Sequence, residues 1–247
     1  MKADPFVQLR LLDLQALDTS LDQLRHRRRT LPELAEITRL EGLVEGLRDA
    51  VVAAETELSD LQREQDRFER EIEQVRARKA RDEERLGSGA ITNPKQLQDM
   101  EHEVATLTRR QSDLEDGELE VMEKVEEVQG RLDALLTQRA RHTADREAAE
   151  QRRDTAFAEI DADIARTTDE RAQTAATFPP DLLALYEKVR EKTGGVGAAA
   201  IGHGRCGGCR LDLMNNELAD IRTAAVDDVL RHEECGRIMV RTAESGL

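Results

Sequence analysis

The fold of this 247-residue chain is decided by residues 40–75, which read LEGLVEGLRDAVVAAETELSDLQREQDRFEREIEQV. Apolar positions recur there at alternating intervals of four and three residues, which is the seam of a coiled coil. The seam positions are Leu40, Val44, Leu47, Val51, Ala54, Leu58, Leu61, Gln65, Phe68, Ile72 and Val75. Because the residues between them are mostly charged, the stretch predicts a long helix with one apolar side.

A second run of the same period occupies residues 97–135. Its seam positions are Leu97, Met100, Val104, Leu107, Gln111, Leu114, Glu118, Val121, Val125, Val128, Leu132 and Leu135. The chain is 36% charged and only 2% aromatic, a composition that coiled coils share with disordered proteins. Disorder does not produce a sustained seam, so both runs are predicted to be helices.

A short breaker, GSGAITNPKQ at residues 87–96, separates the two runs. Gly87 suits the left-handed position after a last helical turn. Asn93 suits the cap of the next helix, and Pro94 suits its first turn. A short loop between two heptad segments predicts an antiparallel coiled-coil hairpin with its tip at residues 87–95.

The pairing of the two helices is predicted from the polar position in each seam. With Gln65 opposite Gln111, the two amides hydrogen-bond each other, whereas a leucine opposite either one would leave an amide unsatisfied. Polar pairs of this kind fix the register of a coiled coil at some cost in stability. In this predicted register Phe68 meets Leu107.

The pattern changes after the hairpin, at a Phe-Pro-Pro break. Residues 181–195, DLLALYEKVREKTGG, predict a short amphipathic helix that two glycines end. We therefore expect a mainly α chain with a coiled-coil hairpin at residues 1–177, a linker helix at residues 178–195, and a small domain at residues 196–247.

The small domain contains all three cysteines of the chain, in two clips with the spacing of metal ligands. Cys206 and Cys209 form a C-x2-C clip, and His232 and Cys235 form an H-x2-C clip. Thiolates and imidazole at these spacings predict one structural, tetrahedral zinc ion. His203 is an alternative fourth ligand, but His232 is favoured because the other choice would leave Cys235 alone.

Two other uses of the cysteines fit less well. A redox pair with C-x2-C spacing favours a βαβ context, whereas glycines and predicted short strands surround this clip. A disulfide framework suits an even count of cysteines, and the N-terminal residues lack the apolar core of a signal peptide. We expect a zinc ribbon of short β-hairpins and short helices, in a cytoplasmic protein without a membrane span.

The order of these parts resembles a known family. The tip ITNPKQLQDME, the helix LLALYEKVR and the clips CGGCRLDL and CGRIMVR are similar to those of bacterial C4-type zinc-ribbon proteins with an N-terminal coiled-coil hairpin. One branch of that family includes the flagellar zinc-ribbon chaperone of the nitrogen-type sigma factor. The resemblance implies an adaptor or chaperone for a transcription factor. The family has cysteine at all four ligand positions, whereas this chain has His232 at the third.

An enzyme and a nucleic-acid-binding protein are the two other classes of function to weigh. Four protein ligands leave no open position on the zinc, and the sequence offers no phosphate-binding glycine loop, so we expect no enzyme. Nucleic-acid binding by the ribbon is the alternative function, carried by arginines such as Arg210 and Arg237. Acidic residues outnumber those arginines in the ribbon, and the net charge of −15 repels phosphate.

We therefore expect a protein adaptor whose partner belongs to the transcription or nucleic-acid-processing machinery. A spacer with two distinct ends suits bridging, and an acidic surface attracts basic partners. The residues expected to contact a partner are Ile91, Asn93 and Lys95 at the hairpin tip, and Arg210 and Arg237 in the ribbon. Pairing of leftover seam positions with a second copy stays open.

Overall fold

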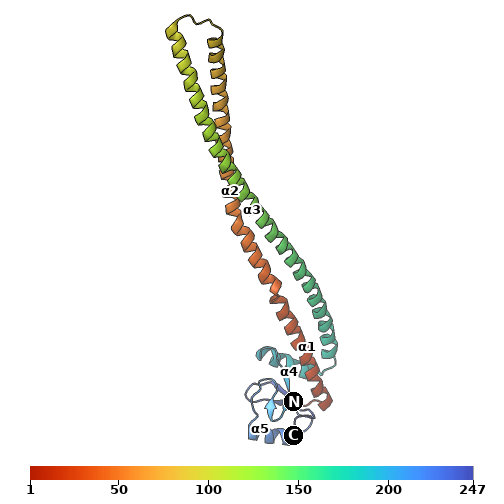
Figure 1. Ribbon diagram of the computed structural model, residues 1–247. Helices are drawn as coiled ribbons and strands as arrows, with labels where there is room; N and C mark the ends of the chain where they lie inside the picture. The colour runs from red at the N-terminus through yellow and green to blue at the C-terminus, as the bar shows by residue number, and fades with distance from the viewer. Residues whose placement is uncertain (247) are drawn as a thin grey trace. The chain divides into compact units, whose positions relative to one another are not determined.

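The computed structural model describes residues 1–246, which are mainly helical (Figure 1). The helices are α1 (Pro5–Arg29), α2 (Pro32–Gly87), α3 (Pro94–Ala175), α4 (Pro180–Lys192) and α5 (Asn215–Thr223). The strands are β1 (Ala198–Gly202), β2 (Arg205–Cys206), β3 (Leu230–Arg231) and β4 (Ile238–Val240). The predicted fold class, a coiled-coil hairpin followed by a small domain with short strands, is confirmed.

Prolines mark where the long helices begin. Pro5, Pro32, Pro94 and Pro180 are the first residues of α1 to α4. Proline suits this position because its fixed φ matches the helix and the first turn needs no backbone donor. Asp4 adds a cap to α1, since its Oδ1 accepts a hydrogen bond from the Phe6 backbone N–H at 2.8 Å. Local sequence therefore sets these boundaries.

The contacts within the chain define two compact units. One consists of Ala35–Glu150, and the other combines residues 1–34 with the chain from Gln151 onward. The first unit holds most of α2 and the tip-proximal part of α3. The second holds α1, the end of α3, α4 and the strands.

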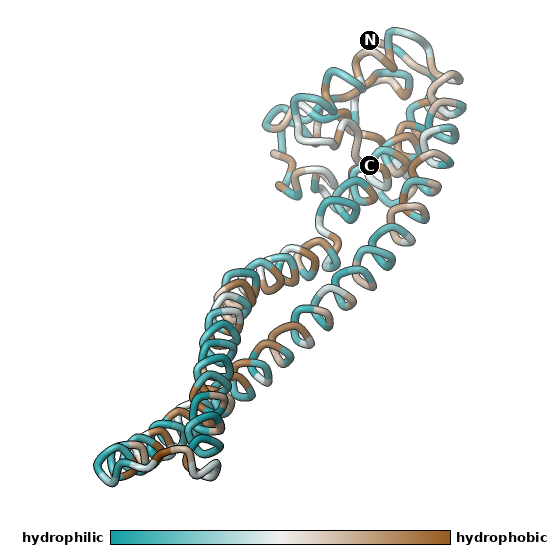
Figure 2. Tube along the Cα trace, turned by 90° about the horizontal axis from the view of Figure 1, so that it is seen from above, coloured by the Kyte–Doolittle hydropathy of each residue, from teal (hydrophilic) through white to brown (hydrophobic). Residues whose placement is uncertain are grey.

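In the first unit, α2 and α3 run antiparallel and are joined by the tip loop (Figure 1). Val51, Ala54 and Leu58 of α2 pack with Val128 and Leu132 of α3 in one buried cluster. Most residues of the two helices are hydrophilic, and hydrophobic residues recur along both of them (Figure 2). This is the arrangement that the heptad seams predict, because only one stripe of each helix is buried.

The pairing of α2 with α3 differs from the predicted register. The Phe68 ring lies so close to Gly117 that a Cβ atom added to this glycine would be 2.9 Å from Phe68 Cε1. The prediction that Phe68 meets Leu107 is therefore wrong. The ion pair between Arg78 and Glu103, at 2.6 Å, agrees with a pairing shifted in the same direction.

The two seam glutamines are also not used as predicted. Gln65 Nε2 donates to Glu69 Oε1 at 3.3 Å, and Gln111 Nε2 donates to Glu115 Oε1 at 2.8 Å. Each glutamine is only partly buried and finds its acceptor one turn along its own helix. No amide is left unsatisfied, so the penalty that was expected to force the two glutamines together does not arise.

In the second unit, the strands form one sheet of order β2-β1-β4-β3. The central strands β1 and β4 are parallel, with Ala199 opposite Met239. The outer pairings are antiparallel, with Ile201 opposite Cys206 between β1 and β2, and Leu230 opposite Met239 between β3 and β4. The short hairpins predicted for the ribbon are therefore present, and a parallel pair connects them.

The sheet shares its core with helices from distant parts of the sequence. Leu11 and Leu14 of α1 and Tyr186 of α4 are completely buried and pack in one cluster with Ile238 and Val240 of β4. The N-terminal residues join the same unit, since the Ala3 backbone N–H donates to the Asp227 carbonyl at 2.8 Å. The helix predicted as a linker is thus packed against the ribbon.

A buried polar network connects α1, α3 and α4. The Tyr186 hydroxyl donates to Asp18 Oδ2 at 2.7 Å, and Arg171 Nε donates to Asp18 Oδ1 at 2.9 Å. Gln15 Oε1 accepts the Gly197 backbone N–H at 2.7 Å, which ties α1 to the start of the sheet. Burial and the neighbouring Asp18 carboxylate both raise the pKa of Tyr186, so the hydroxyl remains a donor.

No helix within residues 1–246 has both the length and the apolar character that crossing a membrane requires.

Candidate metal centre

The first clip is a tight turn at the end of β2. The Gly207 backbone N–H donates to the Ala200 carbonyl at 2.9 Å, and the Arg210 backbone N–H donates to the Cys206 carbonyl at 2.7 Å. A Cβ atom on Gly207 would lie 2.9 Å from that Ala200 oxygen, and one on Gly208 would lie 2.4 Å from the Arg237 side chain. Glycine is needed at position 207, where the neighbour is backbone, whereas a larger residue at position 208 would have to displace the Arg237 side chain.

The second clip follows β3 and has a similar turn. The His232 backbone N–H donates to the Arg237 carbonyl at 3.0 Å, and the Gly236 backbone N–H donates to the His232 carbonyl at 2.8 Å. Gly236 has a φ of 69°, a left-handed conformation that glycine adopts without strain. Both clips therefore hold their ligand side chains on turns that are closed by backbone hydrogen bonds.

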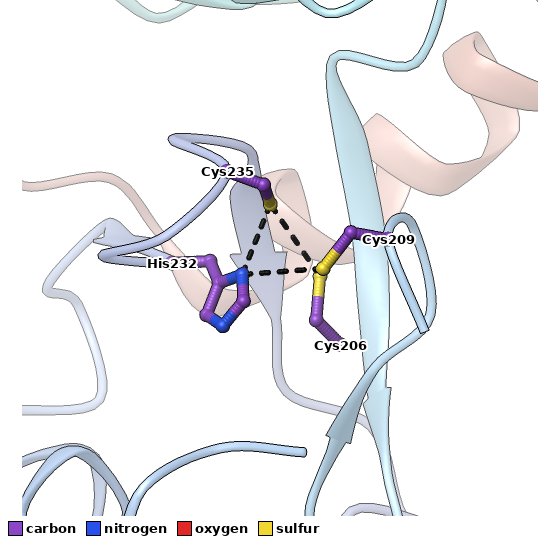
Figure 3. Close-up of side chains that lie close together, drawn as sticks. All are labelled: Cys206, Cys209, His232 and Cys235. Atoms are coloured by element: carbon purple, nitrogen blue, oxygen red, sulfur yellow. Dashed lines mark hydrogen bonds between the residues drawn. The ribbon is translucent and has the colours of Figure 1, made fainter. Parts of the chain in front are cut away.

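The four predicted ligands face one another (Figure 3). Cys206 Sγ, Cys209 Sγ, His232 Nδ1 and Cys235 Sγ belong to a cluster whose donor atoms all lie within 4.8 Å of one another. His232 Nδ1 is 3.0 Å from Cys235 Sγ and 3.4 Å from Cys209 Sγ. Three sulfurs and one imidazole nitrogen at these distances fit one structural zinc ion, and together they would fill all four of its coordination positions.

The alternative ligand His203 is not part of this cluster. Its side chain is exposed, and its φ of 47° places it in the turn between β1 and β2. His232, by contrast, is 1% exposed and belongs to the buried side of the ribbon.

Two of the cysteines have environments that shift their thiol pKa values in opposite directions. Burial raises the pKa of Cys206 to about 11, although N–H groups of the first clip oppose the shift. Burial acts in the same direction on Cys235, but the Arg237 backbone N–H, the His232 side chain and the Arg237 guanidinium outweigh it and lower the pKa to about 6. Since zinc binds thiolates, its uptake must release protons from this site.

Glu217 is a residue of this site that sequence reasoning missed. It lies in the first turn of α5, is 5% exposed, and places Oε2 at 3.8 Å from His232 Nε2. Its Oε1 accepts the Glu233 backbone N–H at 3.1 Å, which holds the second clip in place. At 3.8 Å this contact is longer than a hydrogen bond, so the carboxylate acts on the ring through its charge, which favours the proton on the nitrogen that faces away from the metal.

Its sequence signal was the pattern MNNELADI, in which a glutamate occupies an inward position of a short amphipathic helix. A charged side chain at such a position needs a buried partner. The pattern does not say which partner, because His232 follows 15 residues later on a different element.

The chain matches two known sequence domains. The CT398-like coiled coil hairpin domain matches residues 14–194, and the C4-type zinc ribbon domain matches residues 205–239. The chain belongs to the CT398-like family. His232 is therefore a departure from the four cysteines that the description of the ribbon implies, and the donor set remains suitable for zinc.

Mycobacterial relatives of the CT398-like family match the chain over almost its whole length. An uncharacterised protein of Mycobacterium tuberculosis is 41% identical over 241 residues, or 98% of each chain. An uncharacterised protein of Mycobacterium leprae is 34% identical over 227 residues, or 92% of this chain and 97% of the relative.

Two solved structures have a similar fold. A protein from Mycobacterium smegmatis gives a TM-score of 0.84 at 35% identity, over 98% of this chain and 100% of that one. CT398 from Chlamydia trachomatis gives a TM-score of 0.66 at 19% identity, over 96% and 98% of the two chains. The likeness to CT398 is a likeness of fold alone.

The residues predicted to contact a partner lie in different settings. Arg237 is partly buried and donates to the backbone carbonyls of Val196 and Thr193 at 3.1 and 2.8 Å. Its guanidinium thus connects the second clip with the end of α4. Arg210 is exposed beside the first clip, with a φ of 64°. Of these two arginines, Arg210 presents the more accessible side chain.

At the hairpin tip, Asn93 has a structural role. Its Oδ1 accepts the Lys95 backbone N–H at 2.9 Å, which caps α3 as its sequence predicts. The Lys95 side chain is exposed and Ile91 is partly exposed. Asn93 is exposed as well, but its Oδ1 is used in the cap, so Lys95 and Ile91 are the better candidates for contact with a partner.

Proposed function

We propose that this chain is a non-enzymatic zinc-ribbon adaptor that binds a cytoplasmic protein partner of the transcription or nucleic-acid-processing machinery. The observation that carries the proposal is an open hollow of about 410 Å³ at the hairpin tip. Ile91 and Met100 give it an apolar part, and Arg78, Arg85 and Asp99 are among the charged residues around them. A hollow lined by apolar residues and by charges of both signs suits a protein surface.

The metal site supports the non-enzymatic part of the proposal. The two clips supply four protein ligands, a full tetrahedral set for a zinc ion of the structural type, which leaves no coordination position for water or substrate. The ribbon is then a rigid domain held by its metal, and contact with another macromolecule is a more suitable use for it than chemistry.

The proposal is tested by affinity capture from a native lysate with Ile91→Asp as the central variant. A charge in the apolar part of the hollow should remove a partner that binds there. The matched control is Val52→Asp, since Val52 is an exposed apolar residue of α2, with 53% of its surface accessible. Half of each sample is treated with nuclease.

A stoichiometric protein that survives nuclease, is kept by Val52→Asp and is lost with Ile91→Asp would support the adaptor. Capture that depends on intact nucleic acid would favour the alternative function, a nucleic-acid-binding ribbon carried on a coiled-coil spacer. Equal capture by both variants would place the contact elsewhere on the chain and overturn the role of the tip.

A further inference from the structure

A second hollow lies beside the zinc clips, between α4 and the second clip. Its volume is about 280 Å³. Leu185 and Val189 of α4 supply an apolar wall, while Cys235 belongs to the opposite wall. We call this hollow the α4 cleft.

Cations gather around the α4 cleft without acidic neighbours among its lining residues. Lys188 and Lys192, one turn apart on α4, face the cleft together with Arg231 of β3. Arg231 Nε is engaged by the Gly236 carbonyl at 3.0 Å, whereas neither lysine forms an ion pair with any residue of the part of the chain described by the structure. Against these three cations the lining offers one anionic group, the thiolate that Cys235 would give to the metal, so the lining keeps a net positive charge in a chain of net charge −15.

Helix electrostatics explains only part of this arrangement. Lys192 lies in the last turn of α4, where a cation is favoured by the helix dipole. Lys188 lies a turn earlier, and Arg231 comes from a separate strand, so neither is placed by that effect. Their convergence leaves positive charge that an anionic ligand would neutralise.

We propose that the α4 cleft binds an acidic peptide segment of the protein partner, which deepens the adaptor function proposed above and rests on it. An apolar side chain of the segment packs on Leu185 and Val189, and carboxylates on either side of it pair with Lys188, Lys192 and Arg231. Charge complementarity of this kind sets orientation and selects against other partners.

A peptide fits the α4 cleft better than a nucleic acid does. No aromatic side chain lines the cleft, so bases have no surface on which to stack. A volume of about 280 Å³ holds one or two side chains rather than a run of nucleotides. A phosphate backbone leaving the cleft would also meet the acidic surface of the rest of the chain, whereas a peptide carries its charge at a few positions.

Both walls of the cleft are held before a ligand arrives. On the α4 side, Tyr186 is buried and bonded to Asp18, and Arg237 donates to the Thr193 carbonyl at the end of the helix. On the other side, backbone hydrogen bonds close the second clip, from the His232 N–H to the Arg237 carbonyl at 3.0 Å and from the Gly236 N–H to the His232 carbonyl at 2.8 Å. A preformed cleft costs little ordering on binding, and the zinc ion would contribute to recognition by holding one wall.

The test measures binding of labelled peptides by fluorescence anisotropy. The first peptide alternates aspartate with leucine, the second replaces leucine with serine, and the third probe is an oligothymidylate of the same charge. Each probe is titrated with the wild-type chain, with Lys188→Ala/Lys192→Ala, and with Arg39→Ala/Lys124→Ala. The last variant removes the same charge from exposed positions of the hairpin, and zinc content is measured in all three proteins.

We expect the aspartate–leucine peptide to bind the wild type and the hairpin variant alike, and to bind the cleft variant at least about fivefold more weakly. The serine peptide should also bind more weakly, because it has nothing to place on the apolar wall. Equal weakening in both double variants would show a general charge effect and overturn the proposal. Oligothymidylate binding that depends on Lys188 and Lys192, without peptide binding, would overturn the choice of occupant.

Capture of partners from a lysate tests the cleft proposal and the adaptor proposal separately. If Lys188→Ala/Lys192→Ala captures the same partner as the wild type, the cleft proposal fails and the adaptor stands. If the wild type captures no protein although the peptide binds in the cleft as expected, the adaptor fails and the cleft is an anionic-peptide site of another use.

Discussion

The imidazole of His232 can bind a metal through Nδ1 only if its proton is on Nε2. Glu217 Oε2 lies 3.8 Å from that Nε2, so we expect Glu217→Ala to weaken zinc binding by about 10- to 100-fold. Glu217→Gln should lie between the wild type and Glu217→Ala, because an amide oxygen still accepts the Glu233 backbone N–H. Competition with a chromophoric zinc chelator measures the affinity of each protein.

The control for this prediction is Glu234→Ala. Glu234 lies in the same clip but is exposed, so its removal changes the charge near the metal without touching His232. We expect its zinc affinity to stay within about twofold of the wild type. Equal losses in Glu217→Ala and Glu234→Ala would mean that any negative charge near the clip has this effect, and that the place of Glu217 behind the imidazole does not matter.

Asp18 is the residue on which the packing of α1 against α4 depends. It is 2% exposed and accepts hydrogen bonds from Tyr186 and Arg171. Asp18→Ala therefore leaves Tyr186 with only the longer bond to Gln15, at 3.1 Å, and takes from the Arg171 Nε its acceptor while its pairing with Glu187 remains. We expect the free energy of unfolding of this unit to fall by about 2–4 kcal/mol. Denaturant unfolding followed by a probe in the ribbon measures the loss. Asp13→Ala, at an exposed position of the same helix, should change it by less than about 0.5 kcal/mol.

The difference between these residues and the zinc ligands shows what sequence can predict at this scale. The ligands were predicted because each clip is local and its spacing follows from the geometry of the metal. The buried position of Asp18 was not predicted, because its partner Tyr186 is 168 positions away in the sequence and an aspartate on a helix is usually exposed to solvent. Only the tertiary contacts show that this one is buried.

Among the secondary structure elements, the ends of the helices were predictable and their pairing was not. Asn93 and Pro94 act through the backbone of their own segment, and α3 begins at these signals. The end of α2 was predicted one step too early, because Gly87 is still helical and Gly89 has the left-handed φ of 66°. The register depends on how two seams fit together. Sliding one helix past the other by a whole heptad brings apolar positions opposite apolar positions again, so the seam alone does not fix the register. Gln65 and Gln111 do not fix it either, because each forms its hydrogen bond within its own helix.

The corrected register makes a prediction at Gly117. A leucine there would collide with the Phe68 ring, because even a Cβ atom would lie 2.9 Å from Cε1. We expect Gly117→Leu to destabilise the hairpin by about 1–3 kcal/mol, and Phe68→Ala to relieve most of that loss when the two are combined. Thermal unfolding of the four proteins in this double-mutant cycle measures the coupling.

Gly130 provides the matched control for that cycle. It also lies within α3, but a Cβ atom added there meets nothing within 4 Å. Gly130→Leu should therefore stabilise the helix by up to about 1 kcal/mol through its higher helix propensity. A stabilising Gly117→Leu, without coupling to Phe68, would contradict the observed pairing and reopen the predicted one.

For the whole molecule, the division into two compact units implies that the metal stabilises one of them and not the other. The hairpin unit, Ala35–Glu150, has its own buried clusters and contains none of the zinc ligands. The other unit has a small sheet whose strands are two to five residues long, and a sheet of this size depends on the metal for its stability.

We therefore expect removal of zinc by a strong chelator to make backbone amides of residues 198–240 exchange with deuterium at least about tenfold faster. Amides of the hairpin unit should keep their exchange rates, because their hydrogen bonds lie within the helices of that unit. Exchange read by mass spectrometry measures both sets in one experiment, and adding zinc back should restore the ribbon. Faster exchange in both units would show that the metal stabilises the hairpin too. Unchanged rates in the ribbon would mean that the core formed by α1, α4 and β4 holds the sheet without zinc, and the clips would then serve recognition more than stability.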